Sequence, residues 1–434
     1  MGLARLILLA VIGGADAREP AALIVDLASD RPAVRVEAAG VLEELGRPAL
    51  PALYQARGSD DPELRRQVEP LIDLIERQRL LRATRVRLDF DETPIAAVAD
   101  DLRAQTGFPV VVGPDESLRA RRVTLHAPGL VPFWESLDRV AAASGVRHNP
   151  GVPFSPALRE PTVLLGIADG PPVPSSDDGP FRFHLVRFAR HREVTPVRPP
   201  ADPKSRESLS AEIHVFAEPG LAVSPIGPVL LKEAVDDRGR DLRLDPPVGP
   251  APGRVLPPRF EEGHAARFAL QIPLKPGAGP GGRLRRLKGR VRVAVIARTG
   301  DPIIVPLAGA AGRPFSTAGT TLSVGVVRTV AETASFQFAI REEQADGRFA
   351  RGRALEVGGY RPPDQVEYHV QLQDDRGRML WWDAGPLRSA EGGGLETSIT
   401  VNPSPGGTPA RLLYHGVIGA AAMLFFEFHD LPLP

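Results

Sequence analysis

The pattern of hydrophobic and polar positions changes period twice along the chain. Residues 19–80 carry apolar side chains at helical spacing, and residues 86–148 alternate between strand-like and helix-like segments. From Phe181 onward, apolar residues recur at every second position, as expected of strands with one buried face. The pattern predicts N-terminal helices, then a small mixed α/β unit, then many short and mostly antiparallel strands.

Two segments of the helical region begin with the same short motif. Asp30-Arg31-Pro32 precedes Val34-Arg35, and Asp61-Pro62 precedes Leu64-Arg65. An Asp-Pro pair caps a helix and starts its first turn. The region resembles HEAT repeats, although it holds fewer than the roughly three units that a solenoid needs. It fits either a protein-binding surface or a helical cap on the next domain.

Residues 86–148 carry a structural signal at almost every boundary. Alternation over residues 86–90 predicts a strand. Thr93 and Pro94 predict the N-cap and first turn of a helix, and Gly107 predicts its end. Two further strands and a second helix follow, over residues 110–112, 122–126 and 132–145. The predicted unit is a two-layer βαββα domain, because apolar strand faces need helices to cover them.

Specific residues of this unit match a known domain. They are Val86-Arg87-Leu88-Asp89-Phe90, Thr93-Pro94-Ile95, Gln105-Thr106-Gly107-Phe108, Val110-Val111-Val112, Arg122-Val123-Thr124-Leu125 and the run from Phe133 to Gly145. Together they resemble the short N-terminal domain of secretins and TonB-dependent transducers (STN domain). The resemblance implies a small interaction module of the bacterial cell envelope. No secretin ring or TonB-dependent barrel sequence follows, so the resemblance does not extend to secretion or uptake.

The remaining chain predicts two immunoglobulin-like β-sandwiches, since short alternating strands recur in two blocks. The sequence lacks the Cys…Trp…Cys pattern of true immunoglobulin domains, so the prediction concerns architecture alone. The predicted order is a signal peptide at 1–17, HEAT-like repeats at 18–82, the βαββα domain at 83–149, a Pro/Gly linker at 150–180, and β-sandwiches at 181–310 and 316–434.

The two β-blocks share a short motif. Asp236-Asp237-Arg238-Gly239 and Asp374-Asp375-Arg376-Gly377 each lie between apolar runs. We expect hairpin turns there, in which Asp bonds its own backbone and Gly takes a positive φ. Calcium is the other interpretation, but both segments lack the alternating oxygen ligands of a calcium loop. We therefore predict no metal site here.

The N-terminus predicts export. Arg5 precedes the apolar run Leu6–Ile12, and Ala15-Asp16-Ala17 fits signal-peptide cleavage after Ala17. A buried N-terminal helix is the alternative. We expect no transmembrane span, because the apolar run at 416–426 is far shorter than the roughly 20 residues a spanning helix needs. The predicted location is the periplasm or cell envelope.

Composition narrows the possible partners and chemistry. Lys and Arg total 53, as do Asp and Glu, so no net charge draws the chain toward nucleic acid. The sequence has no Cys, which excludes disulfides and thiol chemistry. Its nine His residues show no metal-binding spacing, and no nucleophile motif or carboxylate pair predicts catalysis. We therefore predict neither a cofactor nor an enzymatic activity.

Two groups of residues are candidate interaction sites. Trp381 and Trp382 are adjacent, so on a strand one would face the core and the other a partner, and Phe425-Phe426 poses the same question. The densest basic cluster comprises Arg283, Arg285, Arg286, Lys288, Arg290 and Arg292. It fits contact with anionic envelope polymers or lipid headgroups, or a solvated strand that protects a sheet edge.

These observations predict a non-enzymatic, exported scaffold or adaptor that binds an envelope protein. The alternative is a carbohydrate- or cell-wall-binding protein that uses its β-sandwiches, the tryptophan pair and the arginine cluster to hold a polysaccharide.

Overall fold

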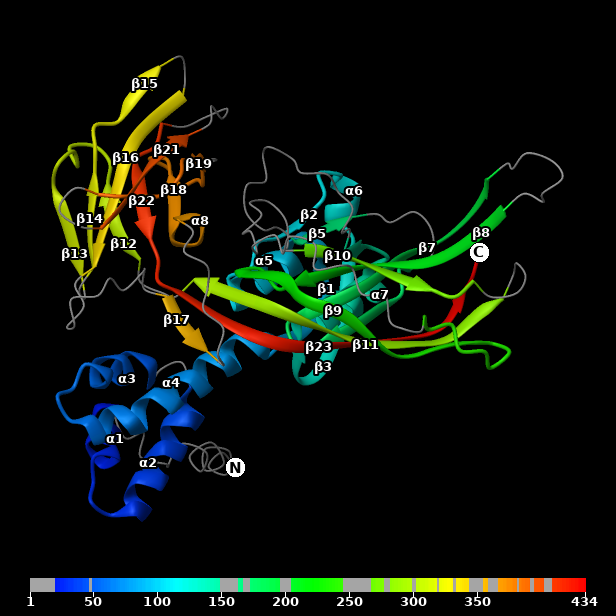
Figure 1. Cartoon of the computed structure of the whole chain (residues 1–434), viewed down its shortest axis with the longest axis horizontal. Helices are drawn as coiled ribbons and strands as arrows, with labels where there is room; N and C mark the ends of the chain where they lie inside the picture. The colour runs from blue at the N-terminus through cyan, green and yellow to red at the C-terminus, as the bar shows by residue number, and fades with distance from the viewer. Residues whose placement is uncertain are drawn as a thin grey trace, which may run out of the picture. The chain divides into compact units, whose positions relative to one another are not determined.

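N-terminal helices followed by mostly antiparallel β-sheets make up the chain, which confirms the prediction from the hydrophobic pattern (Figure 1). The chain divides into two compact units, residues 1–79 and 80–434. The predicted signal peptide, residues 1–17, lies outside the described residues. The computed structural model describes residues 20–46, 49–148, 163–166, 172–195, 204–244, 267–276, 282–298, 302–317, 320–330, 333–342, 354–357, 366–380, 382–390, 394–401 and 408–434.

The N-terminal helices are α1 (Pro20–Leu27), α2 (Pro32–Leu45), α3 (Leu50–Arg57) and α4 (Pro62–Leu81). The Asp61 carboxylate accepts a hydrogen bond from the Glu63 backbone N–H at 2.8 Å, so it caps α4 as expected. The N-cap of α2 is Arg31, which makes no side-chain cap hydrogen bond, so the expected Asp30 cap is not formed. Leu23, Leu42, Leu53 and Val68 are buried and draw the helices onto a common apolar core.

The mixed α/β unit has the predicted order of strand, helix, strand, strand and helix. Its elements are β1 (Arg85–Pro94), α5 (Ile95–Thr106), β2 (Val110–Val112), a short α6 (Glu116–Arg119), β3 (Arg122–Pro132), α7 (Phe133–Ser144) and β4 (Arg147–His148). Gly107 and Gly145 end the two main helices with φ of 73° and 69°, a conformation that glycine adopts without strain.

The start of α5 differs from the prediction. Its N-cap is Pro94 instead of Thr93, and the Thr93 hydroxyl donates to the Asp91 carbonyl. Thr93 is still part of β1, where it pairs with Val123. The Ile95 N–H at the start of the helix donates to the Arg121 carbonyl at 2.8 Å. A tertiary contact therefore replaces the local cap.

The predicted linker at 150–180 contains two strands among its described residues. β5 (Val163–Gly166) pairs in parallel with β2 and antiparallel with β4, and its Val163 and Leu165 belong to the core of the mixed α/β unit. β6 (Ser175–Asp178) pairs with the next strand of the chain. Both flanking domains thus use residues of this segment.

The first β-region consists of two four-stranded sheets, in the orders β10-β8-β7-β6 and β17-β23-β11-β9. Their remaining strands are β7 (Phe181–Thr195), β8 (Lys204–Ala217), β9 (Leu221–Asp236), β10 (Arg267–Leu274), β11 (Arg283–Arg298), β17 (Ala354–Val357) and β23 (Val417–Pro432). The rings of Phe183 and Phe426 lie 5.4 Å apart and connect the two sheets through a common interior.

The second β-region also consists of two sheets around one core, in the orders β12-β22-β18 and β13-β14-β16-β21-β19. Val305, Leu412, Phe338 and Ile399 contribute to this core from both sheets. The elements are β12 (Ile303–Pro306), β13 (Pro314–Thr317), β14 (Thr320–Val324), β15 (Arg328–Val330), β16 (Thr333–Glu342), α8 (Val366–His369), β18 (Val370–Gln373), β19 (Trp382–Ala384), β20 (Arg388–Ser389), β21 (Leu395–Val401) and β22 (Arg411–Tyr414).

Strand pairing crosses the predicted boundary between the blocks 181–310 and 316–434 in both directions. β23, drawn in red in Figure 1, pairs with β11 from Arg283↔Pro432 to Arg298↔Val417. β12 lies within the first block but pairs with β22 of the second. Alternation identifies strands but not their neighbours, so the sequence did not indicate this exchange.

Both predicted Asp-Asp-Arg-Gly turns are confirmed, and their geometry is the same. The Oδ1 of Asp236 accepts from the backbone N–H groups of Arg238 and Arg240, at 3.0 and 2.8 Å. Asp374 repeats this contact with its own turn at 2.9 and 2.8 Å. Gly239 and Gly377 have φ of 76° and 77°. The buried carboxylates are thus occupied by donors of their own turns.

Candidate functional site

Of the two adjacent tryptophans, Trp382 is the one that faces a core. Trp382 is 8 % exposed, pairs with Val401 and belongs to the core of the second β-region. Trp381 lies outside the described residues. Phe425 and Phe426 do divide between two faces, since Phe425 is 43 % exposed and Phe426 is 2 % exposed. As expected of adjacent residues on a strand, the two phenylalanines therefore face opposite sides of the sheet.

The basic cluster lies on β11, which is a central strand with β9 on one side and β23 on the other. The interpretation that it protects a sheet edge is therefore wrong. Arg283 donates to the Asp430 carbonyl, and exposed Arg285 lies where the pairing of β11 with β9 is irregular. The remaining cations alternate along the outward-facing side of the strand, because inward positions such as Val291 are buried.

One end of this strand is neutralised by carboxylates. Arg286 pairs with Glu427 at 2.5 Å and with Glu233 at 3.4 Å, and Lys288 pairs with Glu427 at 2.6 Å. Hydrogen bonds from Lys288 and Arg286 lower the pKa of Glu427 to about 2. These two cations contribute little to recognition, because their charges are already balanced.

At the other end of β11, the positive charges are not neutralised in this way. Within the part of the chain that the structure describes, Arg290 and Arg292 have no carboxylate partner. Arg290 lies in register between Leu230 of β9 and Phe425 of β23, and Arg292 lies beside Met423. Of these apolar neighbours, Leu230 is 38 % exposed, Phe425 is 43 % exposed and Met423 is 37 % exposed.

A third cation completes this surface. The Nζ of Lys232 lies 5.6 Å from the centre of the Phe425 ring, at the distance of a cation–π contact. We call the set Leu230, Lys232, Arg290, Arg292, Met423 and Phe425 the basic–apolar face. The arginine cluster predicted this surface in part, whereas its apolar members come from strands distant in sequence.

The basic–apolar face is supported by a packed interior. An added Cβ at Gly289 would lie 2.5 Å from Cζ of Phe426, so the glycine allows that ring to fill the space below the strand. On the free side of β23, the Asp178 carboxylate accepts from the Phe425 N–H at 2.8 Å, and the Ser176 hydroxyl accepts from the Glu427 N–H at 3.1 Å. Side chains of β6 therefore satisfy backbone donors that no strand pairs there.

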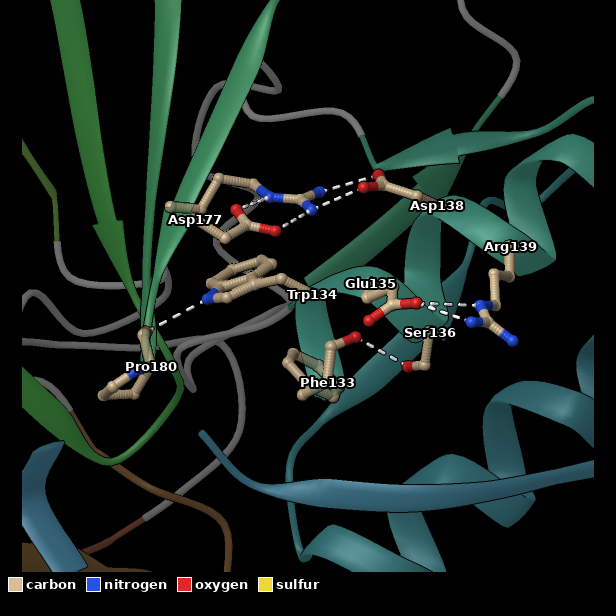
Figure 2. Close-up of polar contacts among 9 residues, drawn as sticks. Phe133, Trp134, Glu135, Ser136, Asp138, Arg139, Asp177 and Pro180 are labelled. Carbon is tan, nitrogen blue, oxygen red and sulfur yellow. Dashed lines mark hydrogen bonds and ion pairs between the residues drawn. The ribbon is translucent and has the colours of Figure 1, made fainter. Parts of the chain in front are cut away.

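A second polar cluster, which the sequence did not indicate, connects α7 with the first β-region. The guanidinium of Arg182 on β7 donates to both oxygens of Asp138 on α7, at 2.7 and 2.5 Å, and to both oxygens of Asp177 on β6, each at 2.7 Å (Figure 2). It also lies 5.3 Å from the Trp134 ring. The indole N–H of Trp134 donates to the Pro180 carbonyl at 3.0 Å.

We call Trp134, Asp138, Asp177 and Arg182 the arginine junction. Burial lowers the pKa of Arg182, but hydrogen bonds to Asp177 and Asp138 outweigh it and raise the pKa overall. Alternation along β7 places Arg182 on the polar face, which predicts exposure, yet its side chain is only 2 % exposed because α7 covers that face. The sequence carries no signal for this pair, since Arg182 and Asp138 are 44 positions apart.

Three titratable groups border the arginine junction. Burial is the main cause that lowers the pKa of His148 and of His184 to about 3, and neighbouring positive charge adds to it. Burial also raises the pKa of Glu218 to about 7, although the Thr84 N–H donates to its carboxylate at 3.1 Å. Perturbed groups often mark active sites. Here the main cause of each shift is burial where the mixed α/β unit packs against the first β-region.

Among the described residues, no group of three or more His, Asp or Glu side chains is arranged to hold a metal ion. No described helix combines the length and apolar character needed to cross a membrane.

No protein family, curated protein or solved structure that was compared with the chain matches it. The similarities to HEAT repeats and to the secretin and TonB-transducer domain therefore remain predictions from the residues that carry them.

Proposed function

We propose that this chain is a non-enzymatic scaffold or adaptor, exported to the periplasm or cell envelope, that binds a protein partner through the basic–apolar face. The observation that supports the proposal is the composition of that face. Exposed Phe and Met together with Arg are side chains enriched in protein interfaces, and Arg is among the residues that most often carry the binding energy. An envelope adaptor would use its other domains to hold this surface in place.

The domain predictions agree with this role. HEAT-like helices, an STN-like module and immunoglobulin-like sandwiches are building blocks that commonly mediate contacts between proteins, and the signal-peptide pattern in residues 1–17 supplies the compartment. N-terminal sequencing of the protein from fractionated cells tests the compartment. A mature chain that begins at Arg18 supports export, and an unprocessed cytoplasmic chain contradicts it.

The carbohydrate-binding alternative rests on one half-exposed tryptophan of the pair Trp381-Trp382. Trp382 is 8 % exposed and is part of a hydrophobic core, so it presents no face to a sugar. The alternative therefore depends on Trp381, which lies outside the described residues. The basic–apolar face lies wholly among the described residues, which favours the adaptor proposal.

Site-specific photo-crosslinking in cells that produce the chain tests the adaptor proposal. We would place a photoreactive amino acid at Phe425 and, as a matched control, at Val330, which is 74 % exposed in the second β-region. A discrete crosslinked protein from Phe425 that is absent from Val330 supports the proposal. Equal crosslinking from both positions, or none from Phe425, contradicts it.

A further inference from the structure

The basic–apolar face combines a local excess of positive charge with exposed apolar area. The chain as a whole has a net charge of +0, so this excess belongs to one surface and not to the protein in general. Arg286 and Lys288, on the same strand, are neutralised by Glu427 and Glu233. Arg290, Arg292 and Lys232 are the cations of the basic–apolar face itself that remain for a partner.

The arrangement of these groups restricts the partner's shape. Arg290 and Arg292 are two positions apart on one strand, so their side chains leave the same side of the sheet about 6.6 Å apart. Carboxylates at alternate positions of an extended peptide have the same spacing. Phe425 and Leu230 flank Arg290 on the neighbouring strands, where they can cover apolar side chains of that peptide.

We propose that the basic–apolar face binds an extended acidic segment of a protein partner, with Asp or Glu at alternate positions and apolar residues beside them; this inference rests on the proposed adaptor function. Arginine forms bidentate contacts with carboxylates, and the apolar side chains of such a peptide can cover exposed Phe425, Met423 and Leu230.

An anionic membrane is a weaker fit to the same surface. Basic clusters that hold anionic lipid contain about four to eight cations. The basic–apolar face offers three cations. Arg283 and Arg285 lie at the far end of β11, beyond Arg286 and Lys288, which are paired with Glu427. A narrow peptide can occupy the basic–apolar face alone, whereas a flat bilayer would also cover the part of the strand where Arg286 and Lys288 are paired.

Fluorescence anisotropy with the purified full chain tests this proposal. The probe is a fluorescein-labelled peptide of alternating glutamate and threonine flanked by phenylalanine, and the comparison peptide has lysine in place of glutamate. We expect saturable binding of the glutamate peptide that weakens as salt is raised, and no binding of the lysine peptide. Equal binding of both peptides, or none of the glutamate peptide, overturns the proposal.

Charge-reversal variants locate the binding site. We expect Arg290→Glu combined with Arg292→Glu to weaken binding of the glutamate peptide about tenfold or more. The matched control is Arg238→Glu with Arg376→Glu, two exposed turn residues, which should change binding less than about twofold. If the double reversal fails to fold by circular dichroism, Arg290→Gln with Arg292→Gln replaces it. Equal effects of the test and control pairs contradict the assignment.

Two further measurements distinguish failure of this inference from failure of the adaptor function on which it rests. Vesicles of equal phosphatidylglycerol and phosphatidylcholine should not bind; vesicle binding without peptide binding assigns the face to membranes and overturns the proposal. A protein crosslinked from Phe425 together with failure of the glutamate peptide contradicts the acidic segment but leaves the adaptor function intact. Absence of that crosslink contradicts the adaptor function itself.

Discussion

Arginine has opposite roles in two regions of this molecule. At the arginine junction, Arg182 is 2 % exposed at its side chain and bonded to two carboxylates, Asp138 and Asp177. On the basic–apolar face, Arg290 and Arg292 lie at the surface and, among the described residues, have no carboxylate partner. The first arrangement uses all of its charge internally, whereas the second leaves charge available to another molecule.

Burial and surface charge thus shift pKa values in different ways in the two regions. At His148, His184 and Glu218, burial next to the arginine junction is the main cause of the shift. At Glu427, beside the surface that we propose for recognition, hydrogen bonds from Lys288 and Arg286 lower the pKa. Four predictions test this contrast.

Removing the buried guanidinium should have the largest effect. Breaking a buried ion pair costs about 3–5 kcal/mol, and we expect Arg182→Met near the lower end because the Asp138 side chain is 56 % exposed and can regain water. Urea unfolding followed by tryptophan fluorescence measures the free energy. Arg139→Met, which removes an exposed pair with Glu135, is the control and should cost less than about 0.5 kcal/mol. Equal losses would show that the arginine junction is not a structural contact.

The groups beside the arginine junction should make stability depend on pH. The two histidines have pKa values of about 3 in the folded chain, so unfolding between pH 6.5 and 4.5 binds two protons. Glu218 has a pKa of about 7 in the folded chain, so it releases one proton on unfolding in the same range. Acidification across this window should therefore lower the free energy of unfolding by about 1.4 kcal/mol per pH unit. Urea titrations at several pH values measure this slope.

Variants separate the opposing contributions to that slope. Glu218→Gln removes the released proton, so the slope should double to about 2.7 kcal/mol per pH unit. His184→Phe removes one bound proton, so the slope should fall toward zero. An unchanged slope in both variants would show that other groups control the pH response.

The packed layer beneath the basic–apolar face should also be sensitive. Gly289→Ala places a methyl group 2.5 Å from the Phe426 ring, and overpacking of this kind typically costs about 1–3 kcal/mol. The control is Gly227→Ala on β9, where the nearest atom, Cβ of Arg292, lies at an ordinary 3.5 Å. Thermal unfolding should distinguish the two variants. Adding Phe426→Leu to Gly289→Ala should recover part of the lost stability. If the stability losses of the two single variants simply add in the double variant, the clash is not their cause.

Neutralising the surface cations should affect stability least. Arg290→Gln and Arg292→Gln should each change the free energy of unfolding by less than about 0.5 kcal/mol. Arg292 is exposed, Arg290 is half-buried, and neither has an ion-pair partner among the described residues. The same variants should reduce peptide binding. Chemical denaturation checks the first expectation and anisotropy the second. A large loss of stability with unchanged binding would place these residues with Arg182 in a structural role.

Local signals in the sequence correctly indicated the elements of the fold. The period of apolar residues, the Asp61 cap, the helix-ending glycines Gly107 and Gly145, and the two Asp-Asp-Arg-Gly turns all depend on contacts within a few positions. The candidate site was only partly predictable. The Arg283–Arg292 run identified β11, but the exposed apolar residues beside it lie on β9 and β23.

By itself, the sequence determined the type of most helices and strands and several of their ends, because caps, turns and alternation act through neighbouring residues. The start of α5 is an exception, since a contact with Arg121 replaces the predicted Thr93 cap. Tertiary structure decided which strands are neighbours, as when β23 returned to β11 and β12 joined β22. It also decided which arginines are buried, since the polar face of β7 is covered by α7 and the outward-facing side of β11 is not. Burial of a charge depends on what packs against it, and the residues that cover Arg182 lie far from it in sequence.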